Sequence, residues 1–269
     1  MDKVVEDHTN TPSNASISGR KRKFQGSQPE IVEMARSKRT KKSESPDETR
    51  TSIQSDDVKE LLSYPNVIVD PDSSWAQRHR IENLPGADIY YQKDFIDEDT
   101  ANSWYEQLTQ LETWYRPTLS MYGKPYVQSR SIASYVTSPN LTARYSGHSV
   151  EMNHPYPALL IEIQNRVSAV LNVGFDHVML NWYQDGSVHI GKHRDTKENQ
   201  VIASLSLGSQ RTFILHPHVS KGEKKVDAEP KRWPLKNGSL LVMQGDTQEN
   251  WKVLNFNIPR DSVFDPSTA

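Results

Sequence analysis

The chain contains no cysteine among its 269 residues. Disulfide bonds and thiolate metal sites are therefore excluded, and any metal must be held by nitrogen and oxygen atoms. No apolar run approaches the roughly 18 residues that a membrane-spanning helix needs, so we expect no membrane partner. The net charge is −2, which gives no overall attraction to nucleic acid, but the charges are unevenly distributed.

The first 57 residues have few aromatic side chains and are rich in Ser, Thr, Lys, Arg and Glu. Such a segment cannot bury enough apolar area to offset the entropy of ordering, so we expect a disordered basic tail over residues 1–57. Basic clusters lie at residues 20–23 and 36–42. They favour a nuclear import signal, and hence a nuclear location, over a tether that contacts phosphates or a solvated tail without a partner.

Residues 58–269 have the composition of one globular domain. Apolar residues recur at helical spacing after Asp97 and again after Pro157, and both positions suit the start of a helix. A tight turn at Gly123 predicts a hairpin. The β-rich runs lie at residues 178–182, 201–207, 211–215 and 239–243. This order predicts a mainly β fold with flanking helices (α+β).

His193 and Asp195 form a His-x-Asp pair after one of these strands. Alternate residues of a strand share a face, so the imidazole and the carboxylate would point to the same side. They would supply two of the three ligands of a facial triad on iron(II). The motif alone decides little, because nine histidines give roughly half of one such pair by chance.

The neighbouring segments give the pair its meaning. Asn181-x-Tyr183 precedes it, and further motifs follow in order: residues 202–208, Arg211-Thr212-Phe213 and residues 238–243. In order and spacing these segments resemble the AlkB-type dioxygenases. The similarity continues upstream through Gly123-Lys124, Tyr145-Ser146-Gly147, the Pro157 helix and Phe175, and so covers about residues 85–252.

This resemblance implies a double-stranded β-helix (jelly-roll) core with iron(II) at its mouth. His193 and Asp195 would be catalytic metal ligands, and Asn181 and Tyr183 would bind 2-oxoglutarate. The implied reaction is oxidative dealkylation of N-alkylated bases in DNA, with RNA left open, releasing aldehyde, succinate and carbon dioxide. We expect a monomeric DNA-repair enzyme. The alternatives are a non-catalytic nucleic-acid-binding relative and a cupin-like binder, which the spacing of the motifs disfavours.

Candidate substrate residues also come from the resemblance. Met121, Tyr122 and Gly123 would form a hairpin tip that wedges into the base stack as a base is flipped out, although Tyr122 also suits an ordinary exposed turn. The other candidates for contacts with base or phosphate are Arg130, Tyr145 and Glu198. Their alternatives are a surface charge, a core aromatic and a solvated loop charge, respectively.

The pattern breaks near its end. Val253 stands where the family has its third iron ligand, a histidine, and no histidine follows His218. The final strand, with two arginines that bind 2-oxoglutarate, is also missing, and residues 253–269 are atypical. His216 and His218 suit surface positions better than the metal site. We interpret the end as a spliced or mis-predicted replacement, and expect weak iron and cosubstrate binding and slow turnover.

Overall fold

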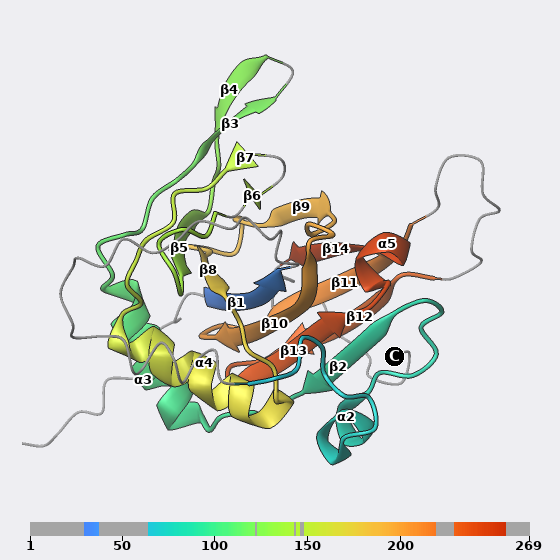
Figure 1. Ribbon diagram of the computed structural model, residues 1–269. Helices are drawn as coiled ribbons and strands as arrows, with labels where there is room; N and C mark the ends of the chain where they lie inside the picture. Colours follow the sequence, from blue (N-terminus) through green and yellow to red (C-terminus); the bar gives the residue numbers. More distant parts are fainter. Residues whose placement is uncertain are drawn as a thin grey trace, which may run out of the picture.

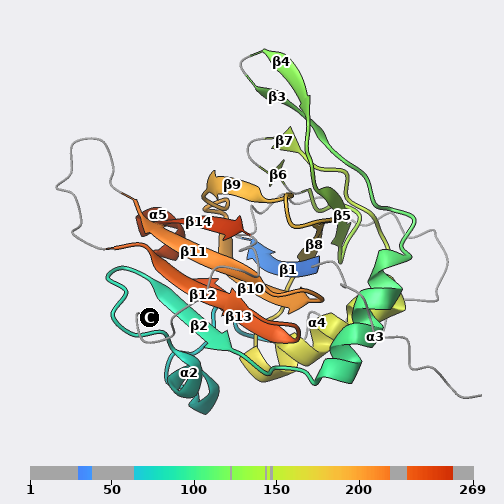
Figure 2. The same cartoon turned by 180° about the vertical axis from the view of Figure 1, so that it is seen from behind.

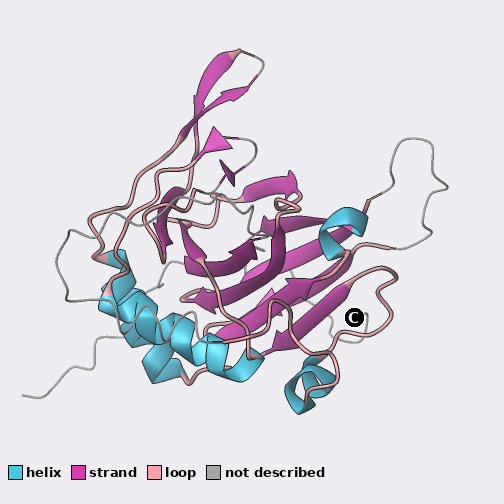
Figure 3. Ribbon diagram, viewed as in Figure 1, coloured by secondary structure: helices cyan, strands magenta, loops and turns pink. Residues whose placement is uncertain are grey.

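The computed structural model describes residues 30–37, 64–121, 123–142, 144–145, 148–218 and 229–256. Over these ranges, no helix is both long enough and apolar enough to span a bilayer. Most strands fall into two sheets (Figures 1 and 3). The larger has the order β2 (Asp88–Gln92), β13 (Ser239–Gln244), β10 (Asn199–Leu207), β1 (Glu30–Ser37), β8 (His177–Trp182) and β5 (Ser131–Val136). The smaller has the order β12 (Lys231–Leu235), β11 (Arg211–Pro217), β14 (Trp251–Phe256) and β9 (Ile190–His193).

Two helices cover the outer face of the larger sheet (Figure 2). In α3 (Glu98–Thr109), the Asp97 carboxylate accepts a hydrogen bond from the Thr100 backbone N–H, and α4 (Ala158–Leu171) begins after Pro157. Both helix starts confirm the sequence prediction. The shorter helices are α2 (Ser74–His79) and α5 (Thr247–Asn250). Buried side chains of α3, α4 and the sheet form one apolar core.

A second apolar core lies between the two sheets and includes Phe213, Leu241 and Trp251. From β8 to β11, consecutive strands alternate between the larger and the smaller sheet, and all the pairings are antiparallel. The arrangement is that of a jelly roll, as predicted. The predicted β-rich runs became β8, β10, β11 and β13.

The strand β1 corrects the prediction of a disordered tail over residues 1–57, which is wrong for residues 30–37. β1 pairs antiparallel with β10 on one side and with β8 on the other. Its apolar residues alternate between the two cores: Val32 and Met34 face the helices, and Ile31 and Ala35 face the barrel interior. These four residues, within five positions, bury enough apolar area to order the segment. The rest of the tail, including the cluster at 20–23, lies outside the described residues.

β1 also changes the interpretation of the missing final strand. The pairs β8–β9, β10–β11 and β12–β13 each give one strand to each sheet, and β14 belongs to the smaller sheet. Following this pattern, the strand that complements β14 would lie in the larger sheet between β8 and β10. β1 occupies that position (Figure 1). The barrel is therefore closed there by a segment from the other end of the chain.

A hairpin of β3 (Thr118–Met121) and β4 (Lys124–Val127) projects away from the barrel on the side of β9 (Figures 1 and 2). Its register pairs Met121 with Lys124, and Gly123 in the turn has φ = 75°, which favours glycine. The hairpin prediction is thus confirmed. Two shorter strands, β6 (Arg144–Tyr145) and β7 (His148–Ser149), form a second small pair.

Candidate active site

His193 ends β9, and Asp195 follows it at the mouth of the barrel. The His193 Nε2 and Asp195 Oδ1 atoms lie 3.5 Å apart, and both side chains are largely buried. The Nδ1–H of His193 donates to the Gly191 carbonyl oxygen at 2.8 Å. In the neutral imidazole, this bond leaves the Nε2 lone pair free to bind a metal. The predicted pair is therefore brought together in a geometry that suits two ligands of one ion.

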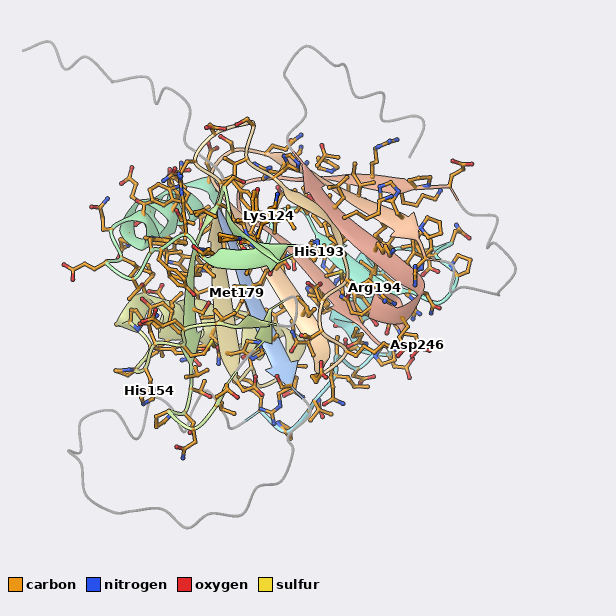
Figure 4. The ribbon with its side chains drawn as sticks, turned by 90° about the horizontal axis from the view of Figure 1, so that it is seen from above. Lys124, His154, Met179, His193, Arg194 and Asp246 are labelled. Atoms are coloured by element: carbon orange, nitrogen blue, oxygen red, sulfur yellow. The ribbon has the colours of Figure 1, made fainter. Side chains whose placement is uncertain are left out.

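These two side chains line a small pocket, part of which is open to solvent. Figure 4 looks down on this side of the molecule and labels His193 and the hairpin residue Lys124. Most of the pocket wall is apolar, contributed by Ile31, Ile190, Phe213, Leu235, Leu241, Met243 and Val253. Its other lining residues are Glu33, Ser204, His193 and Asp195. An apolar wall with a few converging polar groups is typical of a ligand site.

Asn181 links the pocket to a buried arginine. Its side-chain Oδ1 accepts a hydrogen bond from the Nε–H of Arg130 at 2.9 Å, and its Nδ2 donates to Glu33 Oε2 at 3.4 Å. Arg130 is only 4% exposed. The side chain that we considered for a phosphate or base contact thus lies inside, next to the predicted cosubstrate residue Asn181.

The charges in this cluster affect one another. Burial and, to a lesser degree, the nearby Asp195 raise the pKa of Glu33 to about 7, against the lowering effects of His193, Arg130 and Asn181. Burial lowers the pKa of His193, but the hydrogen bond and charge of Asp195 outweigh it, and the pKa is raised overall. Two carboxyl groups and one imidazole therefore line the same pocket and influence one another's pKa.

Tyr183 follows β8 and is fully buried. The guanidinium carbon of Arg211 lies 4.2 Å from the centre of its ring, and the Arg211 Nη2 atom donates to the Val188 carbonyl oxygen at 2.6 Å. Burial lowers the pKa of Arg211. The sequence pattern included Arg211 but gave it no role. In the structure, its guanidinium group lies over the ring of Tyr183.

The third ligand position contains no histidine. Val253 on β14 pairs directly with His193 on β9 and lines the pocket, as expected for the residue standing in the histidine position. His216 pairs with Lys252 and does not line the pocket, and neither does His218. As the side chains lie, no three His, Asp or Glu residues in the described ranges form a cluster that could hold a metal. The role of His193 and Asp195 as metal donors therefore remains a prediction.

The structure describes only some of the residues that we predicted to contact the substrate. Gly123 lies at the hairpin turn and Glu198 is exposed in the loop after Asp195. Met121 ends β3 and Tyr145 belongs to β6, but their side chains, and all of Tyr122, lie outside the described residues. Their roles remain predictions.

Two features of the site were missed from the sequence. Glu33 lay in the segment that we expected to be disordered, where four apolar residues within residues 31–35 were the available signal. Tyr126 and Val127 on β4, which the sequence analysis did not single out within the predicted hairpin, are exposed by 48% and 57%.

Comparison of the sequence with models of protein families identifies the family to which this fold and pocket belong. The family model of the 2OG-Fe(II) oxygenase superfamily matches residues 88–261. The chain belongs to this superfamily. The match extends past residue 252, where we expected the resemblance to end, so the resemblance covers more of the chain than the sequence analysis predicted. In agreement, Val253 and its neighbours form β14, which pairs with β11 and β9.

Individual relatives narrow the assignment to AlkB-type oxygenases. The chain is 29% identical over 235 residues to the DNA oxidative demethylase ALKBH2 of Arabidopsis thaliana, covering 78% of this chain and 74% of the relative. It is 32% identical over 151 residues to the mouse protein of the same name, covering 54% and 62%. It is 29% identical over 164 residues to the human alpha-ketoglutarate-dependent dioxygenase alkB homolog 3, covering 59% and 56%. The oxygenase thus spans little more than half the length of some relatives that it matches.

Proposed function

We propose that this oxygenase removes alkyl groups oxidatively from bases in nucleic acid, using iron(II), 2-oxoglutarate and dioxygen. The observation that carries the proposal is the convergence of His193 and Asp195 on one pocket of a jelly roll, beside Asn181. Relatives named as DNA oxidative demethylases make alkylated DNA the first substrate to test. RNA is the second.

The side chains of the pocket have distinct tasks in this reaction. His193 and Asp195 would hold the iron, which when bound supplies the activation of dioxygen. Asn181 would donate an amide hydrogen bond to a cosubstrate carboxylate, and Arg130 holds the Asn181 side chain in orientation through its Oδ1 atom. The apolar wall excludes water from the reacting carbon.

The hairpin of β3 and β4 suits the nucleic-acid partner. All four residues of β4 are exposed, including Lys124, Tyr126 and Val127. A two-stranded hairpin that packs against nothing is only marginally stable in water. Exposed apolar side chains on such a hairpin are typical of a surface that binds a partner. Apolar and aromatic side chains can enter a base stack, and a lysine can contact a phosphate. The hairpin projects on the side of the barrel where β9 lies, which supports a DNA contact on the same side as His193.

Product analysis with an alkylated oligonucleotide tests the proposal. Purified full-length protein is incubated with iron(II), 2-oxoglutarate and an N-methylated oligonucleotide, as duplex DNA, single-stranded DNA and RNA. We expect succinate and formaldehyde in equal amounts, and the restored base in the oligonucleotide. The His193→Ala variant should form neither product, because it removes one of the two predicted metal donors.

The same assay distinguishes dealkylation from the alternative function, a non-catalytic nucleic-acid-binding protein. Binding of the oligonucleotide without formaldehyde, at any cation concentration, would refute dealkylation and favour that alternative. Replacing Tyr126 by Ser should weaken oligonucleotide binding and leave the melting temperature unchanged, because the side chain is exposed. A partner bound elsewhere would leave the affinity of this variant unchanged.

We also propose a nuclear location and a monomeric state. The basic cluster at residues 20–23 is the simplest candidate for an import signal, and part of the second cluster, Arg36 and Ser37, belongs to β1. A fluorescent fusion in which residues 20–23 are changed to alanine should lose nuclear accumulation. Retained accumulation would contradict the assignment.

A further inference from the structure

Glu33 enters the pocket from β1, a strand to which the sequence motifs gave no part in the site. Alternate residues of a strand share a face, so Glu33 points the same way as Ile31 and Ala35, which belong to the core inside the barrel. It is the charged residue among those that β1 directs inward, and it lines the pocket. β1 thus brings a carboxyl group into the pocket in which the proposed function requires a carboxylate cosubstrate to bind.

The Glu33 carboxyl group accepts the hydrogen bond that Asn181 would give to that cosubstrate. The Asn181 Nδ2 atom donates to Glu33 Oε2 at 3.4 Å, and the Asn181 Oδ1 atom accepts from the Nε–H of Arg130 at 2.9 Å. Both polar ends of the Asn181 amide therefore have a partner within the protein. Since 2-oxoglutarate is a dicarboxylate, it would present to Asn181 the same kind of acceptor oxygen that Glu33 already presents.

Burial shows which of these side chains faces the pocket. Glu33 lines it, whereas Asn181 is 1% exposed and Arg130 is 4% exposed, and within the described ranges neither of these two lines it. Glu33 contacts both the pocket and Asn181, so it stands between them. A molecule in the pocket therefore reaches the Asn181 amide only by displacing Glu33.

The charges of the pocket also oppose a dianion. Glu33 and Asp195 both line it, and there is no lysine or arginine among its lining residues in the part of the chain that the structure describes. Like charges repel each other, and partial burial strengthens the repulsion because the effective dielectric constant is lower than in water. A cosubstrate carboxylate would therefore meet this repulsion in addition to the competing hydrogen bond.

We propose that Glu33 is an internal competitor of the cosubstrate: its carboxyl group occupies the Asn181 amide, and 2-oxoglutarate binds there only when Glu33 swings away. The inference rests on the proposed function, which makes 2-oxoglutarate a ligand of this pocket. The contact can be displaced, because 3.4 Å is longer than the usual hydrogen-bond distance of about 2.7–3.2 Å. β1 then has two tasks: it completes the larger sheet and it limits access to the cosubstrate site.

Direct binding of 2-oxoglutarate tests the proposal without depending on turnover. Isothermal titration calorimetry measures its dissociation constant from the full-length protein, with and without manganese(II). We expect Glu33→Gln to bind 2-oxoglutarate about tenfold more tightly, the factor that corresponds to one hydrogen bond with a charged group. The matched control Glu82→Gln removes an exposed carboxylate and should bind as the wild type does.

Two further variants locate the effect. Glu33→Ala removes the whole carboxyl group and should bind 2-oxoglutarate at least as tightly as Glu33→Gln; it takes the place of that variant should Glu33→Gln unfold. Adding Asn181→Leu to Glu33→Gln removes the amide and should abolish the gain in affinity, as a double-mutant cycle requires of two groups that act on each other. Thermal melting followed by circular dichroism checks that each variant remains folded, and the comparison of Glu33→Gln with the wild type stands by itself if Asn181→Leu unfolds.

The possible outcomes separate this inference from the proposed function. If Glu33→Gln binds 2-oxoglutarate no more tightly than the wild type, Glu33 does not compete and the proposal is overturned. If neither the wild type nor any variant binds 2-oxoglutarate, the proposal fails together with the cosubstrate site. If the affinity rises as expected but no formaldehyde forms from an alkylated oligonucleotide, the proposed dealkylation fails and the competition by Glu33 stands.

Discussion

Truncation of Met34 tests whether β1 is an integral strand of the barrel. Met34 is 1% exposed and packs in the core between the larger sheet and the helices. Met34→Ala removes three side-chain heavy atoms. At about 0.8 kcal/mol for each buried methylene, the lost transfer energy is about 2 kcal/mol. The cavity adds to it, which gives a loss of about 3 kcal/mol in the free energy of unfolding, within the range of about 2–5 for such truncations.

Urea denaturation measures this loss. With a slope of about 2 kcal/mol per molar urea, the midpoint should fall by about 1.5 M. Two matched variants bracket the result. Met34→Leu nearly conserves the volume and should cost less than about 1.5 kcal/mol. Val170→Ala truncates a residue that is 39% exposed and should change stability by less than about 0.5 kcal/mol.

The result that would refute the reasoning is a loss below about 0.5 kcal/mol for Met34→Ala, the size expected of a surface position. In that case residues 30–37 would not stabilise the fold, and Glu33 would have no fixed position in the pocket. Hydrogen exchange adds an independent readout, because the backbone amides of a central strand should be protected to nearly the full free energy of unfolding.

Three further changes follow from the structure. Gly238→Ala should lower stability by about 2 kcal/mol in thermal melting, because φ is +78° and the added Cβ would lie 2.5 Å from the Ile96 carbonyl oxygen; an unchanged melting temperature would contradict this. Arg130→Met should cost about 1–3 kcal/mol by removing the donor to the buried Asn181 oxygen, whereas Arg78→Met, at an exposed arginine, should cost nothing measurable. Hydrogen bonds from Thr100 hold the pKa of Asp97 below its usual 3.8, so the charged carboxylate stabilises the fold above that pH. Asp97→Ala should therefore be less stable than the wild type at pH 7, and the difference should shrink as the pH falls through the folded-state pKa; a constant difference would exclude the charge effect.

Local pattern was sufficient for the elements that carry their own signal. The sequence predicted the capping carboxylate of Asp97, the turn at Gly123 and the apolar runs of β8 and β10, and the structure contains each of them. In each case, the local preference agrees with the final structure. The spacing from Asn181 to Asp195 likewise identified the family. The close approach of His193 and Asp195 needs only two residues on one side of a strand end, so it could be predicted as well.

The sequence by itself determined the family, the jelly roll and the approach of His193 to Asp195, because each depends on contacts close in the chain or on an ordered set of motifs. Only the tertiary structure decided the role of residues 30–37. The four apolar residues within 31–35 are a local signal, but two glutamates, one arginine and one serine stand among them and resemble the polar tail, so this signal alone does not make them a strand. The position between β8 and β10 does so, since it supplies partners for the backbone hydrogen bonds on both sides and two cores for alternate side chains. That long-range pairing is also what brings Glu33 to the pocket that His193 and Asp195 line.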